Sequence, residues 1–224
     1  MNKLCVSFLL LIALVFLISG AAQAETISFD SDSIGPLPSD WTSAMTHSGG
    51  PPQWEIVRDD TSPSQPNVLA QLSSDNTRRR YPLAVLNKVS GKNGDLRVKF
   101  MAVSGEVDAS GGLVWRYLDE NNYYIVRANA LEDNVVLYKV ENGSRSSLAP
   151  KGTARETYGV EAKVSAQIWH TIRVAFQGSL FTVYLNGEKL FEVEDTTFTS
   201  AGKVGLWTKA DSVTHFDDFQ VVVK

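Results

Sequence analysis

The chain has a single cysteine, Cys5, and this residue lies in the apolar segment at the start of the 224-residue sequence. Beyond that segment no thiol is available for a disulfide or for a metal–thiolate site. The three histidines, His47, His170 and His215, are far apart, and none has a carboxylate at ligand spacing. The sequence therefore predicts a fold that needs no disulfides and excludes cysteine as a metal ligand.

The sequence also lacks an excess of positive charge. It has 21 Lys and Arg residues against 25 Asp and Glu residues, for a formal net charge of −4. Removal of the first 24 residues would take away Lys3 and no acidic residue, which changes the net charge to −5. This balance argues against nucleic acid as a partner, because binding to a polyanion depends on clustered positive charge.

Only one long apolar run is present, and it is N-terminal. Lys3 precedes an apolar stretch from Leu4 to about Ile18, and the small-residue ending Ala22-Gln23-Ala24 follows. This pattern predicts a signal peptide, residues 1–24, cleaved before Glu25. A membrane anchor is the alternative, but the run is shorter than the roughly 18 to 20 residues that a spanning helix needs. We expect a secreted or periplasmic protein with no membrane span after cleavage.

No helical periodicity follows residue 24. Instead, short segments rich in β-branched and aromatic residues alternate with turn residues, which is typical of an all-β sandwich or barrel. The 200 residues from 25 to 224 fit a single two-sheet antiparallel β-sandwich domain. The predicted strands are 26–30, 53–59, 67–73, 83–88, 94–103, 111–118, 123–130, 135–141, 168–177, 180–186, 189–194, 202–208 and 214–223.

Hairpin turns and long loops are predicted between these strands. Asn186-Gly187 is a strong two-residue hairpin signal, because a type I′ turn needs positive φ at both central positions. Asn142-Gly143 and Gln177-Gly178 mark further turns. The segments 33–52 and 146–163 are predicted to be surface loops, where ligand contacts tend to collect.

The stretch from Gly111 to Lys139 predicts a binding face. A four-residue turn at 119–122 pairs Leu118 with Tyr123, and directly paired residues share a face. The predicted core face is Leu113, Trp115, Tyr117, Tyr124, Val126 and Ala128. The opposite face carries the candidate ligand-binding residues Arg116, Tyr123, Arg127, Asn129 and Tyr138. Tyr138 is placed beside Arg127 by a two-residue turn at Glu132-Asp133; a three-residue turn would place Lys139 there, as an unfavourable like-charge pair.

Three sequence segments resemble one family. They are FDSDSIGPLPSDW, GGLVWRYLDENNYYIVRANALEDNVVLYKVENGSR and WHTIRVAFQGSLFTVYLNGEKLFEVEDTTFTSAGKVGLWTKADSVTHFDDFQV. Their motifs and their order resemble concanavalin A-like lectin/glucanase jelly rolls of the laminin G and 3-keto-disaccharide hydrolase domain type. The resemblance implies two antiparallel sheets, one of them curved, with sugar bound on the concave face or its rim. Some relatives hydrolyse modified disaccharides.

Catalytic and metal-binding patterns are weak. Glycoside hydrolysis usually needs two carboxyl groups flanking the scissile bond. The run Glu192-Val193-Glu194-Asp195 lacks the spacing of sandwich glycosidases and is interpreted as a solvated edge. GGLVWRY also departs from the Asn-Ser-Gly-containing strand of many 3-keto-disaccharide hydrolases. Catalytic residues therefore stay unassigned.

No cofactor is expected, and a structural calcium ion is the alternative. Two groups of oxygen ligands could hold it. The first is Glu132, Asp133 and Asn134 beside Asn129; the second is Asp30, Asp32, Asp217 and Asp218.

Three functions are consistent with the sequence. The favoured one is a carbohydrate-binding domain in which tyrosines stack on sugar faces and Arg116, Arg127 and Asn129 donate hydrogen bonds. A glycoside hydrolase, with Glu132 or Asp133 as acid or base, is the first alternative. A structural adhesion module without a small ligand is the second.

Overall fold

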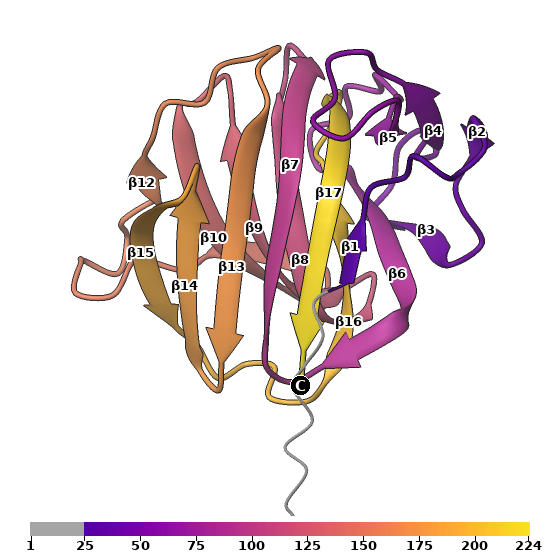
Figure 1. Cartoon of the computed structure of the whole chain (residues 1–224). Helices are drawn as coiled ribbons and strands as arrows, with labels where there is room; N and C mark the ends of the chain where they lie inside the picture. Colours follow the sequence, from indigo (N-terminus) through magenta and orange to yellow (C-terminus); the bar gives the residue numbers. More distant parts are fainter. Residues whose placement is uncertain (1–24) are drawn as a thin grey trace, which may run out of the picture.

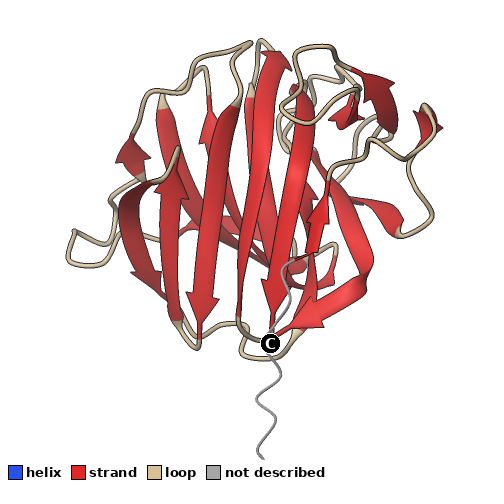
Figure 2. Ribbon diagram, viewed as in Figure 1, coloured by secondary structure: helices blue, strands red, loops and turns tan. Residues whose placement is uncertain are grey.

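The computed structural model describes residues 25–224 (Figure 1), so the predicted signal peptide lies outside the described residues. Residues 25–224 contain strands and loops but no helix (Figure 2), and hence no helix that could cross a membrane. The strands form two antiparallel sheets that pack face to face around one large core. The prediction of an all-β antiparallel sandwich is confirmed.

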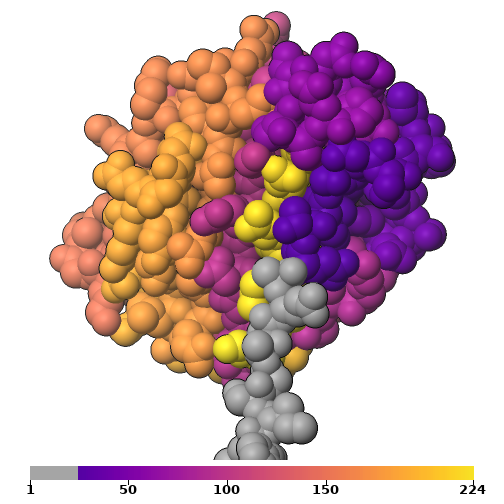
Figure 3. All heavy atoms as spheres, viewed as in Figure 1, coloured from indigo at the N-terminus to yellow at the C-terminus, as the bar shows by residue number. Residues whose placement is uncertain are grey.

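Sheet A faces the viewer in Figures 1 and 3. Its order is β15 (Glu188–Glu194), β14 (Leu180–Leu185), β13 (His170–Gln177), β7 (Gly94–Ser104), β17 (Val213–Val223), β5 (Asn67–Gln71), β4 (Trp54–Arg58) and β2 (Gly35–Pro36). The short strand β1 (Glu25–Ile27) also pairs with β17. The first and last strands of the domain are therefore neighbours.

Sheet B lies behind sheet A. Its order is β11 (Ser144–Ser147), β10 (Asn134–Glu141), β9 (Asn122–Asn129), β8 (Ser110–Asp119), β16 (Gly202–Trp207), β6 (Tyr81–Gly91) and β3 (Trp41–Thr46). The two-residue strand β12 (Val160–Glu161) pairs with β10.

Each of the thirteen predicted segments coincides with a strand. The strands that the sequence did not indicate are β2, β3, β11 and β12, which all lie at or beside sheet edges. The Asn186-Gly187 turn is confirmed, with φ of 50° and 87°, and Asn142-Gly143 has φ of 49° and 76°. Both pairs adopt the left-handed conformation that a type I′ hairpin requires.

The main core lies between the sheets and is rich in aromatic rings. Trp115 stacks on Tyr124 at 5.5 Å between centroids and meets Phe181 edge-on at 5.3 Å. Leu113, Val126 and Ala128 join the same cluster, as predicted. Trp41 and Trp54 are also buried here, so neither offers an exposed ring to a sugar.

Sheet B curls so strongly that its outer face is concave. Arg145 lies on the edge strand β11, yet its guanidinium carbon is 4.3 Å from the ring centroid of Tyr138, 5.6 Å from Trp207 and 4.8 Å from Tyr81 on β6. In a flat sheet β11 and β6 would lie five strand spacings apart, about 24 Å. No arginine side chain spans that distance, so the curl brings the strands together.

A second apolar cluster fills the concave face. Its buried members are Tyr81, Leu83, Val85, Val114, Tyr123, Ile125, Val136, Tyr138, Val140 and Trp207. The face that the sequence assigned to ligand is therefore packed over much of its area by its own side chains.

A bulge in β8 exchanges two side chains between the faces. Gly112 pairs with Arg127 and Trp115 with Tyr124, two residues away from the predicted register, and the register shifts between Trp115 and Asp119. Arg116 has φ of 47° at this bulge. As a result Arg116 points into the main core and Tyr117 joins the concave face, so the predicted faces of these two residues are wrong.

The carboxylate of Asp211 organises the loop before β8. It accepts hydrogen bonds from the backbone N–H groups of Glu106 at 2.8 Å, Val107 at 3.0 Å and Asp108 at 2.9 Å. Burial alone would raise the pKa of the Asp211 carboxyl, but these N–H groups outweigh burial and hold the pKa below its ordinary value.

The lowered pKa of Asp211 predicts acid sensitivity. Because its pKa is lower in the folded than in the unfolded state, its contribution to stability is present above about pH 4 and is lost as the pH falls through the folded-state pKa. Asp211→Asn should lower the free energy of unfolding at pH 7 and lose less of it on acidification. Urea unfolding of both proteins at pH 7, 5 and 3.5 measures this. Equal pH slopes would contradict the assignment.

Candidate functional site

One end of the concave face carries a polar cluster, which we call the Arg127 site. Its members are Arg127, Glu132, Asn134, Tyr138 and Tyr158. β9 supplies Arg127 and β10 supplies Asn134 and Tyr138, whereas Glu132 lies in the turn between these strands and Tyr158 in the loop before β12. The site therefore joins a hairpin to a loop that is distant in the sequence.

The guanidinium of Arg127 is the centre of the site. It is only 2% exposed and donates to Glu132 Oε2 at 2.7 Å and to the hydroxyls of Tyr138 and Tyr158, each at 3.1 Å. It also bonds Oδ1 of Asn134. Burial opposes the charged form, but Tyr138, Glu132 and Tyr158 outweigh it and raise the pKa of Arg127. The arginine is thus a permanently charged donor that uses both of its terminal nitrogens within the site.

Two groups of the site are accessible from outside. Tyr158 is 48% exposed and the Glu132 side chain is 38% exposed. Arg127 and Asn134 both bond Glu132 through Oε2, so within residues 25–224 the other carboxylate oxygen has no hydrogen-bond donor. Burial raises the pKa of Glu132, but Arg127 and Asn134 outweigh this and keep it below the ordinary value. Glu132 therefore presents an ionised acceptor beside an exposed aromatic ring.

The structure brings Arg127, Tyr138 and Asn129 to this end but alters several predicted details. Val136, and not Tyr138, pairs with Arg127, because the turn between β9 and β10 spans residues 130–133. The shift is two residues, so Tyr138 keeps its face and reaches Arg127 through its hydroxyl. Asn129 is buried; its Oδ1 accepts from the backbone of Leu131, whereas its Nδ2 has no partner in residues 25–224.

Two predicted residues do not belong to this cluster. Arg116 is 1% exposed and points between the sheets. Tyr123 does lie on the concave face, but it is fully buried and its hydroxyl bonds Thr46 Oγ1 at 2.7 Å. An exposed sugar platform at Tyr123 is therefore inconsistent with its packing.

Two residues of this face were missed from the sequence. Tyr158 lies in the long segment 146–163, in which no periodicity marks any single residue. Arg145 follows the Asn142-Gly143 turn, and its Nη1 is buried without a partner in the described chain. The predicted concentration of ligand contacts on long loops was the only signal for Tyr158.

A shallow groove of about 370 Å³ adjoins the site. It is lined by Glu132, Asp133, Glu161, Ala162 and Lys163. Lys163 forms an ion pair with Asp133 at 2.8 Å, and Glu161 lies opposite Asn134 on the neighbouring strand β12. The groove extends the polar surface from the exposed edge of Glu132.

The calcium candidates have protein partners in the structure. Asp133 accepts from Lys163 and from the backbone of Val164, and Asp217 accepts from Ser64. Among residues 25–224, no group of three or more His, Cys, Asp or Glu side chains is arranged to hold a metal ion.

The architecture defines the class of fold: a lectin-like β-sandwich, the jelly roll of concanavalin A-like lectins and glucanases. The family model of the galactocerebrosidase C-terminal lectin domain matches residues 151–224, about a third of the chain. No curated protein sequence matches the chain.

Solved structures support this class. The carbohydrate binding module CBM66 from Bacillus subtilis is 18% identical, with a TM-score of 0.60 over 80% of this chain and 93% of that one. The cellulose induced protein Cip1 is 11% identical, with a TM-score of 0.62 over 89% and 97%. A Bacillus subtilis protein of unknown function with a galectin-like fold is 13% identical, with a TM-score of 0.51 over 89% and 100%. At these identities the likeness concerns the fold.

Proposed function

We propose that this chain is an exported carbohydrate-binding domain that holds a sugar at the Arg127 site. The observation that carries the proposal is the exposed Tyr158 ring beside the ionised Glu132, whose free carboxylate oxygen can accept from sugar hydroxyls. An aromatic ring offers an apolar face for a sugar ring to pack on. A charge-assisted hydrogen bond to Glu132 gives orientation. The lectin-like fold supports the same class of ligand.

Arg127 has a supporting role in this proposal. It holds Glu132, Asn134 and the hydroxyls of both tyrosines in fixed positions, so the ligand meets a preformed surface. Preorganisation of this kind lowers the entropy cost of binding. The interaction uses side chains of the protein and needs no cofactor.

Hydrolase activity fits the site less well. A general acid must hold a proton at neutral pH, which requires a raised pKa. Arg127 helps to hold the pKa of Glu132 below its ordinary value, and hydrogen bonds from Lys163 and Val164 hold that of Asp133 below its own. Both groups are suited to accept hydrogen bonds as carboxylates. Membership of the laminin G or 3-keto-disaccharide hydrolase domain families is a narrower proposal than the lectin-like fold class, and it rests on sequence resemblance.

A glycan array followed by titration calorimetry tests the proposal on the exported protein. Tyr158→Ala should weaken binding of the selected glycan about tenfold, or about 1.4 kcal/mol. Glu132→Gln should weaken it by about 1.5 to 3 kcal/mol, the scale of a hydrogen bond to a charged group. Tyr117→Phe, which alters a concave-face tyrosine outside the site, is the matched control and should bind like the wild type.

Three outcomes would count against this function. If no glycan binds, the structural adhesion alternative gains support. Unchanged affinity in Tyr158→Ala and Glu132→Gln would place the sugar elsewhere. Release of new reducing ends during incubation would favour the hydrolase.

Export is checked by intact mass, since protein retaining Met1 to Ala24 would contradict cleavage before Glu25.

A further inference from the structure

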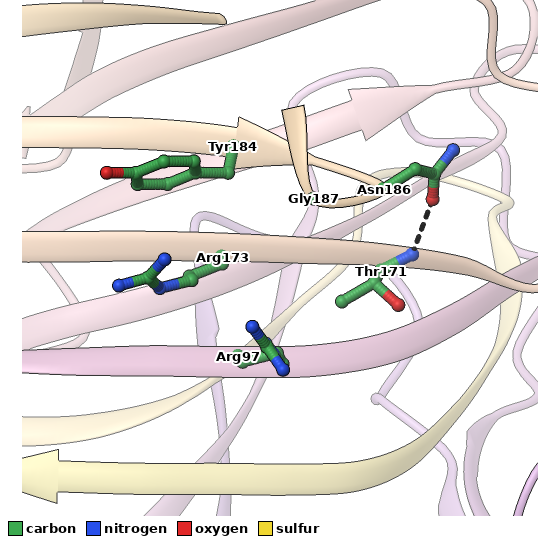
Figure 4. Close-up of a pocket in the computed structure, with 6 residues that line it drawn as sticks. All are labelled: Arg97, Thr171, Arg173, Tyr184, Asn186 and Gly187. Carbon is green, nitrogen blue, oxygen red and sulfur yellow. Dashed lines mark hydrogen bonds between the residues drawn. The ribbon is translucent and has the colours of Figure 1, made fainter. Parts of the chain in front are cut away.

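A second polar pocket lies on the outer face of sheet A, on the opposite side of the sandwich from the concave face. Figure 4 shows the residues that line it. Its volume is about 340 Å³, which is at the lower end of the range for small-ligand sites. The lining residues are Arg97, Thr171, Arg173, Tyr184, Asn186 and Gly187. They come from three adjacent strands, β7, β13 and β14, and from the hairpin turn after β14.

The sheet register places two arginines directly opposite each other. Arg173 on β13 pairs with Arg97 on β7 and with Tyr184 on β14, so the three side chains form one row across the sheet. Like charges directly opposite on neighbouring strands destabilise a sheet. The row therefore concentrates positive charge at a cost that folding alone does not explain.

Only one of the two arginines is neutralised. Asp95 accepts from Arg173 Nε at 2.8 Å and from Nη2 at 2.5 Å, and the Arg173 guanidinium lies 4.4 Å from the centroid of the Tyr184 ring. On the other side, Lys99 pairs with Asp218 at 2.8 Å. Arg97, between these two ion pairs, is exposed and has no acidic partner within residues 25–224.

The wall of the pocket is rigid and rich in donors. Asn186 Oδ1 accepts from the backbone of Thr171 at 2.9 Å, and the Asn186 backbone donates to Thr171 O at 2.8 Å. These bonds fix the turn beside the arginines. Arg173 Nη1 makes no hydrogen bond to residues 25–224, so it and the whole Arg97 guanidinium remain available. Figure 4 shows the Arg173 guanidinium next to the Tyr184 ring and the Arg97 side chain on the neighbouring strand, on the other side of Arg173 from Tyr184.

We propose that this pocket binds the carboxylate of an acidic sugar, a uronate residue of a glycan. Arg97 would bind the carboxylate through a bidentate pair of hydrogen bonds, because a planar guanidinium matches carboxylate geometry. Arg173 adds the second positive charge, and the hydroxyl of Thr171 and the ring of Tyr184 suit the sugar. This site is separate from the Arg127 site and does not depend on sugar binding there.

The test compares oligogalacturonate with its fully methyl-esterified form, which keeps the sugar and removes the charge. Calorimetry on the wild-type protein should detect binding of the acid and no binding of the ester. The affinity for the acid should fall when the salt concentration rises from 50 to 200 mM. Arg97→Gln should weaken binding of the acid at least tenfold. Arg58→Gln is the matched control, because Arg58 is an exposed arginine of the same sheet that pairs with Asp60.

The proposal is overturned if the acid does not bind at millimolar concentration, if the ester binds equally well, or if both arginine variants bind alike. Arg97→Gln should melt no lower than the wild type, because it removes a repulsion; a lower melting temperature would assign Arg97 a structural role instead. Tyr158→Ala should still bind oligogalacturonate, so failure of the Arg127 site would leave this result unaffected.

Discussion

Replacing Arg116 by alanine is expected to lower the free energy of unfolding by about 3 to 5 kcal/mol, the scale for truncating a large buried side chain. Arg116 donates to three backbone carbonyls: Lys92 O at 2.9 Å, Phe198 O at 2.6 Å and Gly178 O at 2.5 Å. Alanine would leave the buried carbonyl of Phe198 and the partly buried carbonyls of Lys92 and Gly178 without this donor, and it would also open a cavity.

Thermal unfolding measures the Arg116 effect. For a domain of this size we expect a fall in melting temperature of about 6 to 20 °C. Arg116→Lys should also be strongly destabilised, because an ammonium cannot reproduce the planar donor set. Arg58→Ala, at an exposed arginine, should change little. If Arg116→Ala and Arg58→Ala melt alike, the three carbonyl contacts contribute little.

Tyr124→Ala is expected to cost a similar amount, about 3 to 5 kcal/mol. The ring is fully buried and packs at 4.8 Å from Phe181 and 5.1 Å from Phe198. Its hydroxyl donates to Asp195 Oδ1 at 2.5 Å and accepts from the backbone of Phe198 at 3.0 Å. The substitution removes the ring, takes away the acceptor of the Phe198 N–H and removes one of the two donors to Asp195 Oδ1, the other being the backbone N–H of Thr197.

Tyr124→Phe separates the two contributions. It keeps the ring and removes only the hydroxyl, so it should cost about 1 to 2 kcal/mol. Urea unfolding of the wild type and both variants gives the three free energies of unfolding. A phenylalanine variant as unstable as the alanine variant would mean that the hydroxyl contacts dominate over packing, contrary to our expectation.

Alternation along the strands predicted much of the fold, because a half-buried strand must place successive side chains on opposite faces. This is why Leu113, Trp115 and Tyr124 were assigned correctly to the core. The bulge at Arg116 could not be predicted in the same way. It depends on a positive φ at a non-glycine residue, which only the surrounding contacts stabilise.

Charge was a poor guide to burial in this chain. Arg80 ends a run of three arginines that begins at Arg78, yet it is fully buried and donates to the carbonyls of Gly50, Pro51 and Ala210. The acceptors lie in loops that the strand pattern does not position. A single sequence therefore cannot distinguish such an arginine from an exposed one.

The candidate site was predictable only in part. Arg127 and Tyr138 share a face through strand periodicity, and a register error of two residues preserved that face. The contact of Tyr158 with Arg127 joins positions 31 residues apart. It depends on the path of an irregular loop and on the curl of sheet B, neither of which has a periodic signature.

The position of β17 has a consequence for how the chain folds. β17 lies between β7 and β5, and its yellow atoms separate the indigo and magenta segments in Figure 3. Without β17, the strands on its two sides have no hydrogen-bonded neighbour that joins them into one sheet. The two parts of sheet A can therefore join into one sheet only after β17 has been synthesised. Until then, the edges of β7 and β5 are unpaired and open to association with other chains, so a chaperone would protect them.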